Sequence, residues 1–175
     1  GTRNVALGYC ALLSNSNDND NTGVGFATLV NSSGQSNTAV GSCALNSNTT
    51  ASNNTAVGSF SMDANTEGGD NTALGRTSLS TNTTGGENVA LGRSTLASNS
   101  TGCKNVAVGS SALLSNSTAN DNIAIGFQSL EQNTTGTSNV AVGCGALESN
   151  TTASDNVAMG KRALGGTTTG CRNTA

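Results

Sequence analysis

Residues 139–155 read Asn-Val-Ala-Val-Gly-Cys-Gly-Ala-Leu-Glu-Ser-Asn-Thr-Thr-Ala-Ser-Asp, and the same pattern begins again at Asn156. The whole chain of 175 residues is built from this 17-residue unit, with one shorter step of 16 residues between Asn21 and Asn37. We number the positions of each unit from 1 to 17, starting at its leading Asn, and expect the missing residue just before Asn31. Residues 1–175 therefore form a single repeat array, whose units begin at Asn4, Asn21, Asn37, Asn54, Asn71, Asn88, Asn105, Asn122, Asn139 and Asn156, with a truncated unit at Asn173.

Positions 4 and 9 are occupied by an aliphatic residue or Met in every unit. Seventeen residues are too few for a pair of packed helices, and the many Gly, Asn, Ser and Thr residues disfavour helix. The repeat predicts an all-β fold, a parallel β-solenoid of about ten coils, with short strands around positions 4 and 9 that pair with the next coil ~4.8 Å away. The rod would be roughly 45–50 Å long. Its predicted core ladder contains Leu12, Leu29, Leu45, Leu79, Leu96, Leu113, Leu130, Leu147, Val40, Val57, Val108 and Val142.

Glycine at position 5 and asparagine at position 1 mark the turns of the coil. Gly takes a positive φ without steric cost, so position 5 is expected where the chain turns. The leading Asn has two interpretations: a ladder of stacked side-chain amides, or a turn residue that tolerates the left-handed conformation. The predicted Asn ladder is Asn4, Asn21, Asn37, Asn54, Asn71, Asn88, Asn105, Asn122, Asn139 and Asn156.

Composition restricts the function classes. Only 2% of the residues are aromatic, and Pro, Trp and His are absent, so the core must be narrow and filled by small aliphatic side chains. The net charge of −3 and the scattered basic residues argue against nucleic acid as a partner. No apolar run reaches the ~18 residues needed for membrane insertion. The first residues do not resemble a signal peptide, and we expect the chain to be a segment of a longer fibre whose export signal or anchor lies elsewhere.

The side chains that could perform chemistry do not converge. With no His, the usual candidates reduce to scattered carboxylates and cysteines, so we expect no enzyme, no cofactor and no metal site. Acidic residues share position 17 but are interrupted by Lys104 and Arg172, which favours a solvated face over a calcium site. The acidic residues of this stripe are Asp70, Glu87, Asp121 and Asp155.

The five cysteines cannot form disulfides within a solenoid of this kind. Cys10 and Cys43 lie two coils apart, and Cys103 and Cys171 four coils apart, whereas the Cα atoms of a disulfide lie within about 7 Å. Cys144 stands alone. Free buried thiols and bridges between chains both remain open.

Sequons for N-glycosylation recur at one turn of the repeat, and Asn53 carries a further sequon elsewhere. The alternative explanation is that turns favour Asn and Thr in any case. The Asn-Thr-Thr rows also suggest an alternative function as a glycan- or ice-binding surface. The predicted glycosylation acceptors are Asn31, Asn48, Asn82, Asn99, Asn116, Asn133 and Asn150.

The strand around position 4 is small or apolar on both of its faces. Alternate residues of a strand face opposite sides, so both sides of this strand are expected to be covered. The chain's own second strand would cover one side and another chain the other; the alternative is close packing of Ala and Gly inside one tight coil. The two chain ends match in repeat phase, and bare coil ends are strand edges that attract further strands. The expected partner is therefore the protein itself, in a lateral trimer or an end-to-end filament.

The repeat resembles known fibre repeats. The Asn-Thr-Ala-Val-Gly block followed by Ala-Leu and Asn-Thr-Thr, as in residues 37–45 and 139–152, resembles repeats of phage and bacterial tail-fibre-like proteins. More distantly, Val-Ala-Val-Gly is similar to the head repeats of trimeric autotransporter adhesins, although those repeats are shorter. The resemblance implies a parallel β-roll, often trimeric, displayed outside the cell, on the cell surface or on a virion.

From this resemblance we expect a rigid fibre or filament segment that acts as a spacer or adhesin, with surface glycans as a further partner. Ligand contacts would be expected at the variable positions 6 and 7. These include Tyr9, Phe26, Phe60, Arg76, Arg93, Phe127, Lys161 and Arg162.

Overall fold

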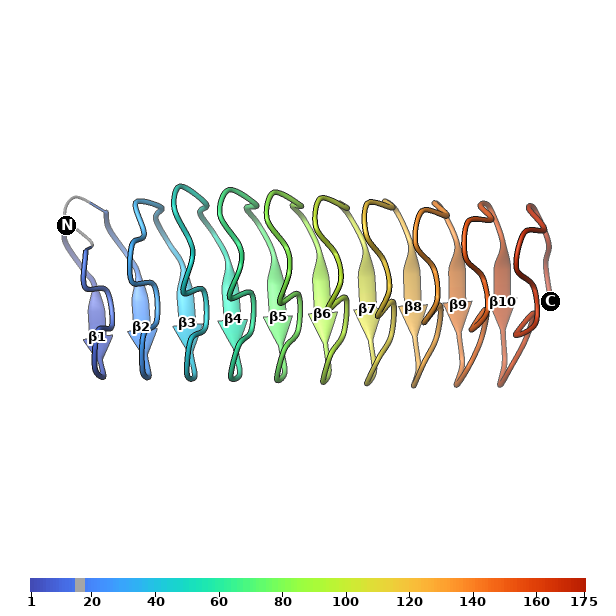
Figure 1. Cartoon of the computed structure of the whole chain (residues 1–175), viewed down its shortest axis with the longest axis horizontal. Helices are drawn as coiled ribbons and strands as arrows, with labels where there is room; N and C mark the ends of the chain where they lie inside the picture. The colour runs from blue at the N-terminus through green and yellow to red at the C-terminus, as the bar shows by residue number, and fades with distance from the viewer. Residues whose placement is uncertain (15–17) are drawn as a thin grey trace.

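The computed structural model describes residues 1–14 and 18–175, and within them the chain is a β-solenoid without helices. Each coil contributes one strand, and the ten strands form a single parallel sheet in sequence order (Figure 1). The predicted fold class is confirmed. The strands are β1 Val5–Leu7, β2 Thr22–Val24, β3 Thr38–Val40, β4 Thr55–Val57, β5 Thr72–Leu74, β6 Val89–Leu91, β7 Val106–Val108, β8 Ile123–Ile125, β9 Val140–Val142 and β10 Val157–Met159.

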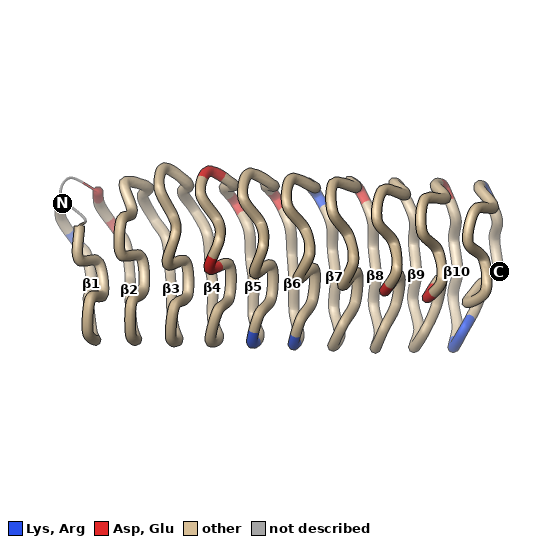
Figure 2. The backbone as a smooth tube through the Cα atoms, in the orientation of Figure 1, with Lys and Arg blue, Asp and Glu red and all other residues tan. Residues whose placement is uncertain are grey.

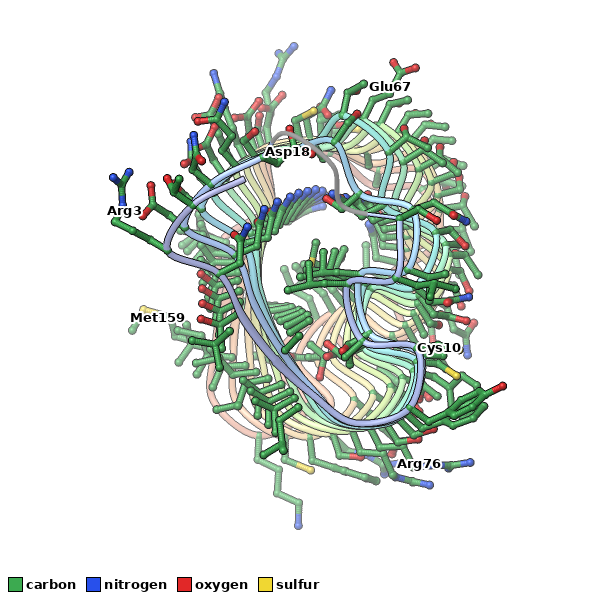
Figure 3. The ribbon with its side chains drawn as sticks, turned by 90° about the vertical axis from the view of Figure 1, so that its left-hand side faces the viewer. Arg3, Cys10, Asp18, Glu67, Arg76 and Met159 are labelled. Carbon is green, nitrogen blue, oxygen red and sulfur yellow. The ribbon has the colours of Figure 1, made fainter. Side chains whose placement is uncertain are left out.

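Neighbouring strands pair at equivalent repeat positions. Val106 of β7 lies opposite Ile123 of β8, and Val108 lies opposite Ile125. A parallel pair needs a connection that returns the chain to its starting end, and here the rest of each coil provides it. The same side-chain positions therefore stack in rows along the whole rod (Figure 3).

The prediction of a second strand around position 9 is wrong. The chain turns there, and the position 9 residues have the left-handed backbone conformation, as in Leu113 at φ 50° and Leu130 at φ 49°. This conformation is uncommon for residues other than Gly. The backbone still bonds to the next coil, since the Leu113 N–H donates to the Ser129 carbonyl at 3.0 Å. Left-handed residues at positions 7 and 9 bend the chain sharply, and the Leu side chains project into the coil.

The hydrophobic core is formed by positions 3 and 9, together with the alanines at position 8, and not by positions 4 and 9. The position 9 residues are buried throughout the middle coils, but the predicted core residues Val40, Val57, Val108 and Val142 are only half-buried. Each strand has three residues, and its central Ala points inward, so the flanking residues at positions 2 and 4 point outward. The buried row at position 3 consists of Ala39, Ala56, Ala73, Ala90, Ala107, Ala124, Ala141 and Ala158, with Gly23 in the same row.

The turn glycines behave as predicted. Gly126, at position 5, has φ 133°, and a Cβ atom on it would lie 2.6 Å from the carbonyl carbon and oxygen of Gly143 in the next coil. A side chain is therefore excluded by the backbone conformation and by the close approach of the coils.

The missing residue of the short unit lies later in the chain than predicted. Ser32 occupies position 12, because its Oγ accepts a hydrogen bond from Asn48 Nδ2 of the next coil at 3.0 Å. Gly34 occupies position 15, because its carbonyl accepts from Asn21 Nδ2 at 2.8 Å. The missing residue therefore falls between Ser32 and Gly34, in an exposed turn, and the bonds from Asn21 to Gly34 and from Asn48 to Ser32 both form despite the shortening.

Candidate functional site

The leading asparagines form a buried ladder along the rod. The Asn105 N–H donates to Asn88 Oδ1 at 3.0 Å, while Asn105 Nδ2 donates to the same oxygen at 3.1 Å and to the Ala119 carbonyl at 2.8 Å. Of the two interpretations of this position, the structure contains the stacked amides. The left-handed residue is the preceding one, Lys104 in this coil, with φ 59°. The predicted ladder residues are fully buried from Asn21 to Asn156, and Asn4 is partly buried.

A second asparagine ladder runs parallel to the first, at position 12. Asn116 Nδ2 donates to Asn99 Oδ1 at 2.8 Å and to the Ala119 carbonyl at 3.1 Å. The Ala119 carbonyl therefore accepts one amide from each ladder. This ladder was not predicted from the sequence. Its fully buried members are Asn48, Asn65, Asn82, Asn99, Asn116, Asn133 and Asn150.

This second ladder corrects the glycosylation prediction. The Nδ2 atom that would carry a glycan lies in the interior and donates two hydrogen bonds, so the folded rod has no room for a sugar there. A signal was present in the sequence: Asn65 keeps the pattern although Glu67 destroys its sequon. Asn31 and Asn53 are exposed, and glycosylation at these two residues stays a prediction. The prediction is contradicted for Asn48, Asn82, Asn99, Asn116, Asn133 and Asn150.

The Asn-Thr-Thr rows do not form one outward surface. Their asparagines point inward, and the first hydroxyl of each row bonds along the rod, as when Thr83 Oγ1 donates to the Ser100 carbonyl at 3.0 Å. The second hydroxyl row faces solvent, for example at Thr84, Thr101 and Thr135, whereas most of the first row is half-buried. A glycan- or ice-binding surface stays a prediction for this outer row alone.

The outward side of the sheet presents a continuous apolar surface. We call the side chains at positions 2 and 4 of β1–β10 the sheet face. Position 4 is aliphatic or Met in every strand, and position 2 is always β-branched. Leu74, Ile125 and Met159 are 49%, 40% and 66% exposed, and no described segment covers them. Met159 projects outward in Figure 3, on the side of the sheet away from the interior.

The two long edges of the sheet face carry different charges. Position 17 lies at one edge and contains five acidic residues together with Arg3, Lys104 and Arg172. Position 6 lies at the other edge and contains no acidic residue (Figure 2). Figure 3 shows the two edges at Arg3 and Arg76. The charged residues are Asp20, Asp70, Glu87, Asp121 and Asp155 at the position 17 edge and Arg76, Arg93 and Lys161 at the position 6 edge.

At the position 17 edge, Arg3 and Asp20 form an ion pair, with 2.5 Å between Arg3 Nε and Asp20 Oδ1. The hydrogen bond and the charge of Arg3 lower the pKa of the Asp20 carboxyl, and Asp20 raises the pKa of Arg3. Asp70 accepts a hydrogen bond from Asn53 Nδ2 at 3.1 Å. These contacts connect successive coils along one edge and none of them crosses the sheet face.

The remaining predicted residues do not gather into a chemical site. All five cysteines are free, with Cys144 and Cys171 exposed. Residues 1–14 and 18–175 contain no group of three potential metal ligands and no helix able to span a membrane. Among the variable residues, the rings of Tyr9 and Phe26 stack with their centroids 5.7 Å apart.

Comparison with known proteins gives no family assignment. No protein-family model matches the sequence, and the searches found no curated protein and no solved structure similar to it. The sheet face is therefore interpreted from its own composition and geometry.

Proposed function

We propose that this chain is a structural fibre segment, a rigid rod that associates side by side with copies of itself through the sheet face. The observation that carries the proposal is the unbroken apolar row at position 4, together with β-branched residues at position 2, on the outward side of all ten strands.

The rod is held together by interactions that repeat from coil to coil. Each strand bonds to the strands of the adjacent coils, and both asparagine ladders link the same neighbours. Contacts restricted to adjacent repeats are typical of solenoids, in which stability is a sum over neighbouring units. Such a molecule holds its two ends at a fixed separation, which is the mechanical requirement of a spacer.

The sheet face supports association with further chains. Parallel sheets are normally covered on both faces, and large exposed apolar patches mark interaction surfaces. Here the rest of each coil covers the inward face of the sheet, and the outward face stays open. A second copy supplies a surface of the same length and repeat, so that every coil contributes equally to the contact.

The resemblance to tail-fibre-like and adhesin repeats supports a place for this rod outside the cell, on the cell surface or on a virion. A role in adhesion would use the variable residues at positions 6 and 7, including the exposed Tyr9 and Phe26. No converging set of side chains supports an enzymatic role.

The solution mass tests the proposal. We expect light scattering to give a multiple of the 17.1 kDa chain mass, and a value of three chains would fit the trimeric analogy. Loss of that mass with reductant would place disulfides between chains, and an open-ended, concentration-dependent mass would indicate end-to-end filaments. A mass of one chain at every concentration would contradict lateral association.

A pair of variants locates the contact. Val108→Glu combined with Val142→Glu places two charges on the sheet face, and we expect single chains that keep the circular dichroism of the rod. The matched control is Ser98→Glu combined with Thr118→Glu, at exposed positions away from the sheet. Equal masses for both variants would show that the sheet face is not the interface.

A further inference from the structure

The charged residues at the two edges of the sheet face are matched strand by strand. Every basic residue at position 6 follows a strand that is preceded by an acidic residue at position 17. No strand has like charges at its two ends, and β3, β4 and β9 have uncharged residues at both. The matched pairs are Asp70 with Arg76 on β5, Glu87 with Arg93 on β6, and Asp155 with Lys161 on β10.

These pairs cannot close within one copy. The two members stand six residues apart across an extended strand, which corresponds to roughly 20 Å. All six side chains are exposed, and none of the six forms an ion pair within the described part of the chain. The matching therefore has no function in an isolated rod.

The size of the sheet face indicates that its edges belong to the contact. Ten strands of three residues cover roughly 45–50 Å by 10 Å, or about 500 Å². A stable interface buries about 800 Å² on each partner. Extending the contact from position 17 to position 6 widens it to about 20 Å and raises the area to roughly 950 Å².

We propose that the copies pack parallel and in register, with the position 17 edge of each sheet face against the position 6 edge of the next copy, joined by ion pairs between Asp70 and Arg76, Glu87 and Arg93, and Asp155 and Lys161. This inference rests on the lateral association proposed above.

Symmetry supplies the orientation. Rotation about an axis parallel to the rod brings the position 17 edge of one copy beside the position 6 edge of another at the same height. An antiparallel arrangement would instead place the acidic edge of one copy against the acidic edge of the other, and like charges repel. Charge complementarity of this kind contributes to orientation and register more than to affinity.

Displacement by one coil removes most of the matching. In one direction only Asp70 and Arg93 remain opposed as unlike charges. In the other direction Glu87 meets Arg76, but Lys104 then meets Arg93 and Arg172 meets Lys161. A closed ring of copies has no displacement along its axis, so it selects the in-register pairing.

A cross-link between copies tests the geometry. Ser138 and Cys144 stand at opposite ends of β9, too far apart for a disulfide within one chain. In a background where the other four cysteines are Ser, Ser138→Cys should form a disulfide with Cys144 of the neighbouring copy on mild oxidation. Denaturing gels should show a series of covalent species that ends at the number of copies in the ring. The matched control is Asn53→Cys. In the proposed register this residue faces Ser59 of the neighbouring copy, which has no thiol, so no such series should form.

Charge reversal tests the ion pairs. Replacing Asp70, Glu87 and Asp155 by Arg gives a rod with two basic edges, and replacing Arg76, Arg93 and Lys161 by Glu gives one with two acidic edges. At low salt we expect each triple variant to need an about tenfold or higher concentration for half-assembly, because three attractions become repulsions. The six-fold variant carrying both sets should assemble like the parent chain.

The outcomes separate the two proposals. If the parent chain is a single chain at all concentrations, the proposed function fails and this inference with it. If the parent chain assembles but Ser138→Cys gives no bond to Cys144, or links to itself, the parallel arrangement is wrong. If both triple variants assemble like the parent chain, the ion pairs do not set the register.

Discussion

At the scale of the residue, the asparagine amide links neighbouring coils and closes its own coil at the same time. Its Oδ1 accepts from the next coil, and its Nδ2 donates to the carbonyl at position 15 of its own coil, as Asn105 does with Asn122 and Ala119. An aspartate at this position would lack the donor. This double use explains why position 1 never varies.

We expect Asn105→Ala to lower the free energy of unfolding by about 2–3 kcal/mol, because the buried Asn122 N–H loses its acceptor. Urea denaturation of the variant measures this loss. Ser98→Ala removes an exposed hydroxyl from the preceding coil and serves as the control. Equal stability of the two variants would mean that the ladder does not stabilise the rod.

Asp63 is a partly buried carboxyl without a full set of partners. Its Oδ1 atom is buried and has no hydrogen-bond partner within the described residues. Burial raises the pKa of this carboxyl above its ordinary value of 3.8, although its own backbone N–H opposes the shift. A carboxyl whose pKa is higher in the folded state destabilises the fold as pH rises above its unfolded value, because the folded state binds the proton more tightly.

Asp63→Asn should therefore raise the melting temperature at pH 7 and have little effect at pH 3, where the carboxyl is protonated in both states. Thermal denaturation at both pH values measures the difference. The same substitution at the exposed Asp121 serves as the control for the change of side chain. A gain that is equal at pH 3 and pH 7 would exclude burial of the charge as its cause.

At the scale of the element, a three-residue strand separates two environments within a few ångströms. In β7, Ala107 is fully buried between the inward rows, whereas Val106 and Val108 face outward. The inner face accepts only the smallest side chains because the Leu row at position 9 fills the remaining space. The size of the side chains on the outer face is limited only by whatever packs against that face.

We expect Ala107→Leu to destabilise the rod by about 1–3 kcal/mol, because the larger side chain overfills the interior. Val108→Leu, one residue along the chain, should be almost neutral, since Leu91 occupies the same position in the preceding strand. Chemical denaturation of both variants gives the comparison. A larger loss from Val108→Leu would reverse the assignment of inner and outer faces.

The repeat period, the turn glycines and the solenoid could be predicted from the sequence, because periodicity and φ requirements are visible in residue types. Which side chains of the strand point inward could not be predicted, since the inward Ala and the outward Val are both small or apolar. The second ladder was hidden as well, because Asn116 in the buried row and Asn53 on the surface carry the same sequon pattern. Left-handed Leu residues such as Leu113 leave no signal in composition.

At the scale of the whole molecule, stability depends on continuity between adjacent coils. The fully buried Leu96 lies in the sixth coil, and its N–H bonds to the Ala112 carbonyl of the seventh at 3.1 Å. No hydrogen bond in the described residues joins coils that are not neighbours. If one coil unfolds, no hydrogen bond therefore connects the coils on its two sides directly.

Leu96→Asp places a carboxylate in the interior, and we expect it to divide the rod at this coil. Limited proteolysis should cut within the sixth coil and release two resistant pieces, with a lower melting temperature. Ser98→Asp, on the exposed surface of the same coil, is the control. Unchanged melting and unchanged protease resistance of Leu96→Asp would contradict the ladder as the source of stability.

The short turn between Ser32 and Gly34 also bears on how such a molecule can change in size. It loses a residue while Asn21 still bonds to Gly34 and Asn48 still bonds to Ser32, so a turn can vary in length without disturbing the neighbouring coils. Because every coil presents the same acceptors and donors to the next, a whole unit can be duplicated or removed in the gene and the remaining units rejoin. The length of the rod therefore changes in steps of ~4.8 Å, one step for each unit that is gained or lost.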